Sequence, residues 1–148
     1  MYFSYETLKE NIVEEVMSFV YHRKIYGFDC DIYGHLNNAN YLKLLEEARS
    51  EALDETAYSV ADLAERNIGI FILRFEIDYK KSLELGDTVK VVSYVRKTGK
   101  LKGAWEQEIY NSKDELCTMV KLNAVYVKNG VPARLPVVIF EEYKKYVD

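Results

Sequence analysis

The hydrophobic pattern of this chain changes its period near residue 69, and this change is the strongest constraint on its fold. From residue 38 to about residue 53, apolar side chains recur at helical spacing on one broad arc: Tyr41, Leu42, Leu44, Leu45, Ala48, Ala52 and Leu53. Beyond residue 69 the period is two, which predicts a strand with one buried face and one mostly polar face. The apolar residues of the expected buried face are Phe71, Leu73, Phe75, Ile77 and Tyr79. One long helix followed by strands predicts an α+β fold rather than an alternating α/β fold.

The remaining expected elements complete one antiparallel sheet. Strand-like runs lie at about 12–28, 87–97, 102–111 and 115–128. Turn residues separate the later runs, at Thr98-Gly99, at 111–114 and at Asn129-Gly130. Shorter helices are expected at about 60–66 and 137–147. We expect a single domain over residues 1–148, with residues 1–11 as a possible N-terminal extension. A sheet curled around the long helix would explain why the apolar arc of that helix is so broad.

Composition and charge exclude several functional classes. The net charge of −4 and the pI of about 5.3 give no electrostatic support for a face that binds nucleic acid. The few histidines and cysteines do not form a metal-ligand pattern, so we expect no metal: His22, Cys30, His35 and Cys117. Glycine motifs that cradle nucleotide phosphates are missing from the sequence. The longest apolar run is too short to span a membrane and no signal-peptide pattern is present, so we expect a cytoplasmic protein with reduced cysteines.

A polar turn directly before the long helix carries the residues with chemical potential. It holds two carboxylates, one histidine and three asparagines: Asp29, Asp31, His35, Asn37, Asn38 and Asn40. Asn37 or Asn38 is a suitable N-cap. A helix N-terminus presents free N–H groups and a partial positive charge, which suit an oxyanion, and a carboxylate a few residues upstream could reach the same point. This combination is sufficient for acyl transfer or hydrolysis. The alternative is a solvated loop that only caps the helix.

The spacing Asp-x-Asp-x-x-Gly-His-x-Asn-Asn-x-x-Tyr, followed by Glu-x-Arg, resembles the signature of the 4-hydroxybenzoyl-CoA thioesterase family of hotdog-fold acyl thioesterases. The segments 75–79, leading to Gly86-Asp87, and 132–136 are similar to later parts of that family. The resemblance implies a hotdog fold, in which a five-stranded antiparallel sheet wraps around the helix that starts near Asn38. It also implies a homodimer or homotetramer, with sheets paired edge to edge and acyl-thioester sites at the subunit interface.

The same resemblance assigns roles to individual residues. Asp31 matches the catalytic carboxylate, the backbone N–H of Asn38 matches the group that polarises the thioester carbonyl, and His35 is a further catalytic candidate. The candidates for substrate binding are Tyr33, Gly34, Asn37, Tyr41 and Glu47. No cofactor is expected, apart from coenzyme A as a part of the substrate. From the residues alone, Asp29 is better explained as a structural carboxylate.

Three functions remain open at this point. The leading one is hydrolysis of an acyl- or aryl-CoA thioester. A thioesterase for acyl-carrier protein is favoured by the histidine motif and disfavoured by Tyr33, which replaces an asparagine of that motif. The third is a hotdog module that binds acyl-CoA without turnover.

Two further expectations concern positively charged residues. Arg49, in the middle of the apolar arc, should form a structural ion pair. The lysines near the 98–99 turn are weak candidates for binding the phosphates of coenzyme A.

Overall fold

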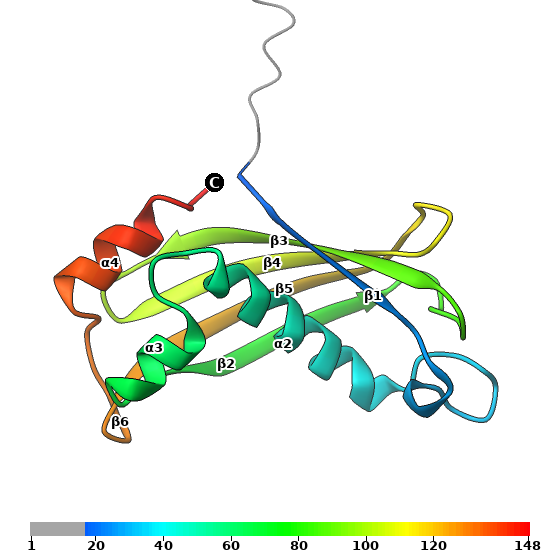
Figure 1. Ribbon diagram of the computed structural model, residues 1–148, viewed down its shortest axis with the longest axis horizontal. Helices are drawn as coiled ribbons and strands as arrows, with labels where there is room; N and C mark the ends of the chain where they lie inside the picture. Colours follow the sequence, from blue (N-terminus) through cyan, green and yellow to red (C-terminus); the bar gives the residue numbers. More distant parts are fainter. Residues whose placement is uncertain (1–16) are drawn as a thin grey trace, which may run out of the picture.

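A long helix lies across one face of a single antiparallel sheet (Figure 1). The computed structural model describes residues 17–148. Its helices are α2 (Asn38–Asp54), α3 (Val60–Glu65) and α4 (Val137–Lys144). Its strands are β1 (Phe19–Lys24), β2 (Ile68–Tyr79), β3 (Thr88–Thr98), β4 (Lys102–Tyr110), β5 (Leu116–Lys128) and β6 (Val131–Pro132). The strand order is β1-β3-β4-β5-β2, and the two-residue β6 pairs with β5 outside this path. The expected five-stranded sheet around a central helix is therefore confirmed.

Helix α2 begins where its sequence places an N-cap. The side chain of Asn37 accepts a hydrogen bond from the backbone N–H of Ala39 at 3.0 Å, which satisfies one donor of the first turn. The apolar arc of the helix is buried against the sheet, at Tyr41, Leu44, Leu45, Ala48, Ala52 and Leu53. The other arc member, Leu42, is exposed on the side that faces β2.

The first strand is shorter than expected from the sequence. Among the residues that the structure describes, β1 begins at Phe19 and ends at Lys24, and Gly27–Asp29 forms a short 3-10 helix instead of continuing the strand. The cause lies in Asp29, whose carboxylate accepts a hydrogen bond from the N–H of Tyr26 and closes the turn. The expected strand at 12–16 and the extension at 1–11 lie outside the described residues.

A β-bulge in β2 changes which side chains of that strand face the core, so the predicted buried face is only partly right. The register against β5 shifts between Ile72 and Arg74, and one extra residue moves the following side chains to the opposite face. Before the bulge, Ile72 packs against the core, and after it Phe75 does so. The prediction was wrong for Phe71 and Leu73, which are 57% and 55% exposed.

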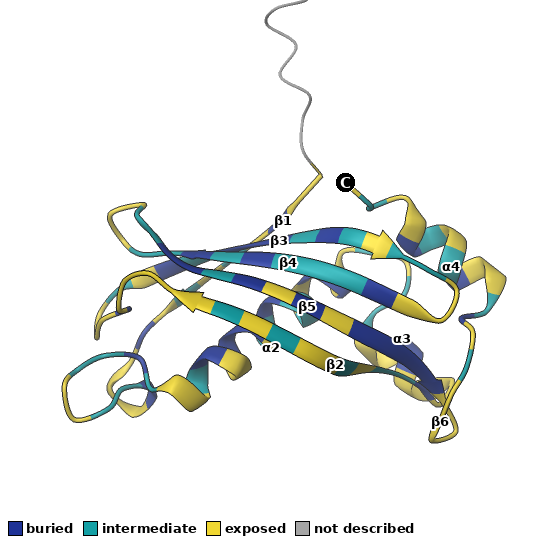
Figure 2. Cartoon of the chain, turned by 180° about the vertical axis from the view of Figure 1, so that it is seen from behind, coloured by how far each residue is buried: buried dark blue, intermediate teal, exposed yellow. Residues whose placement is uncertain are grey.

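Gln107 of β4 holds α2 at a fixed depth against the sheet. Its amide is fully buried, and Nε2 donates to the carbonyl oxygen of Leu45 at 3.1 Å and to Oγ of Ser93 at 2.9 Å. Its Oε1 accepts a hydrogen bond from Nη1 of Arg49 at 2.9 Å. The expected ion pair of Arg49 is therefore wrong: within residues 17–148 its hydrogen-bonding partner is an amide, not a carboxylate. Figure 2 shows the buried residues of β4 and β5 from the outer side of the sheet.

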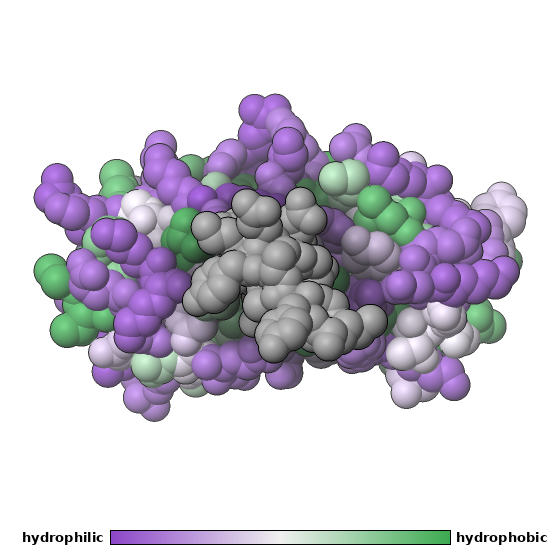
Figure 3. Space-filling model, turned by 90° about the horizontal axis from the view of Figure 1, so that it is seen from above, coloured by the Kyte–Doolittle hydropathy of each residue, from purple (hydrophilic) through white to green (hydrophobic). Residues whose placement is uncertain are grey.

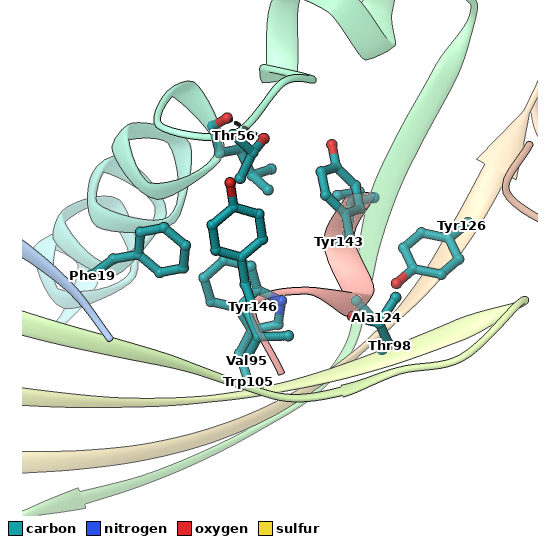
Figure 4. A pocket seen from close by; sticks show the side chains of 12 residues that line it. Phe19, Thr56, Val95, Thr98, Trp105, Ala124, Tyr126, Tyr143 and Tyr146 are labelled. Atoms are coloured by element: carbon teal, nitrogen blue, oxygen red, sulfur yellow. Dashed lines mark hydrogen bonds between the residues drawn. The ribbon is translucent and has the colours of Figure 1, made fainter. Parts of the chain in front are cut away.

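Helix α4 closes the end of the molecule that lies away from the start of α2 (Figure 1). Tyr143 of α4 donates from its hydroxyl to the carbonyl oxygen of Tyr58 at 2.8 Å. Beneath α4, aromatic side chains including Trp105, Tyr126 and Tyr146 surround a cavity of about 20 Å³ (Figure 4). A space of this size holds about one water molecule. It is a small gap in the packing and is far too small for a substrate.

Most of the visible surface is hydrophilic. Seen from above, small apolar groups lie toward the two ends of the molecule (Figure 3). Within the described part of the chain, no helix is both long and apolar enough to cross a membrane.

Candidate active site

The loop between β1 and α2 is held in a tight turn around Asp31. The N–H of Gly34 donates to the carbonyl oxygen of Asp31 at 3.1 Å, and the N–H of Asp31 donates to that of His35 at 2.8 Å. Gly34 has a φ of +74°, a left-handed conformation that glycine adopts without a steric cost. The sequence predicted Gly34 as a binding residue, and the structure shows its contribution to the turn.

Only one carboxylate oxygen of Asp31 is occupied by this turn. Oδ1 accepts hydrogen bonds from the N–H groups of Tyr33 at 2.9 Å and His35 at 3.2 Å. Oδ2 accepts none from any described residue. The capping role and the chemical role considered from the sequence are thus compatible, because each can use a different oxygen of the same group.

The first turn of α2 leaves the backbone N–H of Asn38 open. Asn37 accepts from the N–H of Ala39 through its side chain and from that of Asn40 through its carbonyl oxygen. The N–H of Asn38, which directly follows Asn37, has no acceptor in the part of the chain described. The partial positive charge of the helix N-terminus adds to the polarity of this donor.

A polar cleft of about 310 Å³ brings these groups together. It is lined by Asp31, His35, Leu36, Asn38, Tyr41, Tyr79, Lys80, Lys81 and Ser82. The three predicted catalytic residues and Tyr41 therefore share one cavity. The other predicted binding residues do not line it: Tyr33 is 77% exposed, Asn37 caps the helix and Glu47 lies on the side of α2 that faces β1.

Glu47 and Asp29 belong to an ionic support beneath the loop. Arg23 of β1 binds Asp29 through two hydrogen bonds of 2.8 Å each, and its Nε lies 3.0 Å from Glu47. Tyr21 donates to the same Glu47 oxygen at 3.0 Å. The hydrogen bonds from Arg23 are the main cause that lowers the pKa of Asp29, and burial, followed by the bond to Glu47, raises the pKa of Tyr21 to about 12. The structural interpretation of Asp29 is consistent with these contacts.

Sequence reasoning did not assign the second wall of the cleft. Tyr79, at the end of β2, contacts Tyr41 edge-on with ring centroids 5.0 Å apart. Lys81 pairs with Glu115, whereas Lys80 forms no ion pair within residues 17–148. The period of two predicts a strand through Tyr79, but the distance of Tyr79 in sequence from Asp31 gives no signal that the two residues share a cleft.

An apolar groove lies next to this cleft, between α2 and β2. Its volume is about 510 Å³. Along α2, residues 42, 46, 49 and 53 line it, and they share a helix face with Asn38 because they follow at intervals of three or four. Along β2, Phe75, Ile72, Ile70 and Ile68 line the groove, whereas Tyr79 lines the cleft. The groove therefore begins about one helical turn from Asn38 and runs toward α3.

Other candidate sites are not supported by the geometry. Residues 17–148 contain no cluster of three or more potential metal-ligating side chains. Lys97, Lys100 and Lys102 lie at the turn between β3 and β4, toward α4 and away from the start of α2 (Figure 1). The structure does not bring these lysines to the cleft.

The curled antiparallel sheet wrapped around a buried helix is the hotdog fold. The chain belongs to the Thioesterase-like superfamily, whose sequence model matches residues 28–142. The fold and family expected from the motif are thereby confirmed, and relatives of this chain are named as thioesterases, the enzyme class that the motif predicts. The comparisons do not single out the 4-hydroxybenzoyl-CoA subfamily.

Individual relatives agree with this family. The chain is 33% identical over 86 residues to the long-chain acyl-CoA thioesterase FadM of Escherichia coli, a match that covers 58% of this chain and 64% of FadM. It thus spans slightly less than two thirds of FadM. The structure of a DHNA-CoA thioesterase from Staphylococcus aureus superposes with a TM-score of 0.82 at 26% identity, over 86% of this chain and 89% of that one. A gentisyl-coenzyme A thioesterase has the same fold, with a TM-score of 0.77 at 20% identity over 84% and 98% of the two chains.

The ionic support predicts how stability responds to acid. Arg23 lowers the pKa of Asp29 in the folded state, so this stabilisation is complete above the ordinary carboxyl pKa of about 4 and is lost as the pH falls through the lowered value. We expect Asp29→Asn to reduce the free energy of unfolding by about 2 kcal/mol near pH 7. The difference from wild type should shrink below about pH 4, as thermal and urea unfolding will show.

The matched control is Asp54→Asn, an exposed carboxylate at the other end of α2. Equal effects of the two substitutions across the pH range would contradict the role given to the Arg23–Asp29 pair.

Proposed function

We propose that this protein hydrolyses acyl-CoA thioesters in the cleft at the N-terminus of α2. One observation carries the proposal: the free Oδ2 side of Asp31 and the free N–H of Asn38 belong to residues that line the same cavity. A base or nucleophile and an oxyanion donor are the two elements that acyl transfer to water requires. A loop that only capped the helix would need neither group to remain unpaired.

The proposed reaction places the thioester carbonyl oxygen at the N–H of Asn38. Either Asp31 removes a proton from an attacking water molecule, or its carboxylate attacks first and water then cleaves the anhydride. In both cases the carbon–sulfur bond breaks, and the products are the free acid and the thiol of coenzyme A. His35 lines the same cleft, and its imidazole can orient the substrate or pass a proton to the leaving thiolate.

The groove between α2 and β2 is the proposed site of the acyl group. Its walls are mainly apolar and its length extends beyond a short acyl group. The similarity to FadM, a long-chain acyl-CoA thioesterase, and to the staphylococcal DHNA-CoA thioesterase supports an acyl- or aryl-CoA substrate. Release of a free thiol from acyl-CoA separates this function from binding without turnover, and rates on matched acyl-carrier-protein substrates test the remaining alternative.

We further propose that the active form is a dimer joined through β2. This strand ends the sheet and has a paired neighbour, β5, on one side only among the described strands. Its exposed Phe71 and Leu73 add apolar surface at this edge. An unpaired edge strand can pair with a strand of a second subunit. A partner subunit at β2 would also cover the open side of the groove and so place the acyl-thioester site at the subunit interface, as the resemblance to the family implies.

Replacement of Asp31 by Asn should abolish most of the turnover while the fold is retained. An amide oxygen can still accept the two N–H bonds of the turn, but the group is neither a base nor a nucleophile. We expect kcat to fall about 10²–10⁴-fold, with the dissociation constant for coenzyme A products nearly unchanged. Thiol release measures kcat, and thermal unfolding controls for stability.

Asp54→Asn serves as the matched control for this substitution and should retain activity. A kcat for Asp31→Asn within about threefold of wild type would remove Asp31 from the mechanism.

The dimer has a separate test. Light scattering should give the wild-type protein a mass of at least twice 17.3 kDa. The double substitution Phe71→Asp and Leu73→Asp should shift it to a monomer, because four like charges would meet across the two-fold interface. Val138→Asp, at an exposed apolar position on α4, is the control. A stable wild-type monomer at micromolar concentration would contradict the proposed interface.

A further inference from the structure

One wall of the apolar groove separates it from a second space in the core. Four side chains line both the groove and the small cavity beneath α4: Leu53, Ile70, Trp105 and Ala124. Figure 4 shows Trp105 and Ala124 from the side of the cavity. The groove has a volume of about 510 Å³ and the cavity only about 20 Å³. A chain that follows α2 from Asn38 to the end of the helix therefore meets these four side chains.

Trp105 is the largest residue of this wall. It belongs to β4, the central strand of the sheet, and its indole stacks on Phe19 with ring centroids 6.3 Å apart. Its neighbours on the same face of β4, Gly103, Gln107 and Ile109, are buried, whereas Trp105 is only half-buried. The indole is less buried than its neighbours because it borders both the groove and the cavity.

The groove before this wall suits a hydrocarbon chain. Its polar lining comes from α2 alone, at Glu46, Arg49 and Ser50, and every lining residue from α3 and from the sheet is apolar. The guanidinium of Arg49 is held by Gln107 and lies over the ring of Phe75. Each methylene group that enters such a groove leaves water, which favours longer chains until the wall is reached.

We propose that Trp105 sets the upper limit of acyl-chain length, so that the preferred substrates are unbranched acyl-CoA thioesters of up to about sixteen carbons. This inference rests on the proposed thioesterase function. The indole is a large, rigid ring that Phe19 supports. It cannot yield to a longer chain without disturbing the close packing of the core.

The position of the wall along α2 gives this chain length. Leu53 follows Asn38 by fifteen residues, or about 22 Å along the helix. Long helical side chains lean back toward the N-terminus, which shortens the free path to about 20 Å. An extended chain advances about 1.3 Å per carbon, given carbon–carbon bonds of about 1.5 Å. A straight acyl group of about sixteen carbons therefore spans the distance from the thioester carbonyl to the wall.

The experiment compares hexadecanoyl-CoA with eicosanoyl-CoA, which differ by four methylene groups, at concentrations below those at which they form micelles. For the wild-type protein we expect kcat/KM to be about tenfold or more lower for eicosanoyl-CoA. Trp105→Leu joins the groove to the cavity, and the freed volume holds about four carbons. This variant should raise the ratio of eicosanoyl- to hexadecanoyl-CoA about fivefold or more.

Tyr143→Leu is the matched control. Tyr143 lines the cavity but not the groove, so this substitution also removes a buried aromatic ring but leaves the wall intact. We expect it to lower the melting temperature, because it creates a void in the core, and to leave the ratio of the two substrates unchanged.

The outcomes separate the two proposals. Equal kcat/KM values of the wild-type protein for both substrates, or a ratio that Trp105→Leu and Tyr143→Leu change equally, overturns the role of Trp105 and leaves the thioesterase function intact. Failure of the wild-type protein to hydrolyse any acyl-CoA overturns the function and this inference with it. If Trp105→Leu does not fold, Ala124→Leu decides. It adds bulk to the same wall and must lower the ratio of hexadecanoyl- to tetradecanoyl-CoA severalfold.

Discussion

The burial of α2 against the sheet is the interaction on which the other features depend. The helix contributes six buried side chains to the core, and the amide of Gln107 fixes its depth by bonding to a backbone carbonyl in the middle of the helix. A buried amide tolerates little displacement, because each lost hydrogen bond would leave a polar group unpaired in the core. Both the N-terminus of α2 and its groove-facing side are thereby fixed relative to β2.

This arrangement divides the helix into three functional parts. The apolar arc builds the core, the first turn presents the N–H of Asn38 to the cleft, and the face that follows from Leu42 lines the groove. The loop before the helix is stabilised separately, by the pair of Arg23 with Asp29 and by the turn at Gly34. Because these contacts support the loop from outside the cleft, Asp31 can keep one oxygen free.

Local patterns were sufficient to predict the elements and half of the site. The spacing of apolar residues predicted α2 and the later strands. The polar segment before α2, together with its resemblance to the family motif, predicted Asp31, His35 and Asn38, which share one cleft. Three features depended on long-range geometry and could not be predicted in this way. The bulge at Leu73 arises from pairing with β5, the partner of Arg49 comes from β4, and Tyr79 meets Tyr41 only after the sheet curls.

The most direct test is the structure of the protein with an acyl-CoA analogue in which a methylene group replaces the thioester sulfur. We expect the carbonyl oxygen to accept a hydrogen bond from the N–H of Asn38, the carbonyl carbon to lie beside Oδ2 of Asp31, and the acyl chain to follow the groove between α2 and β2. An acyl chain bound elsewhere, or a carbonyl group turned away from Asn38, would contradict this expectation.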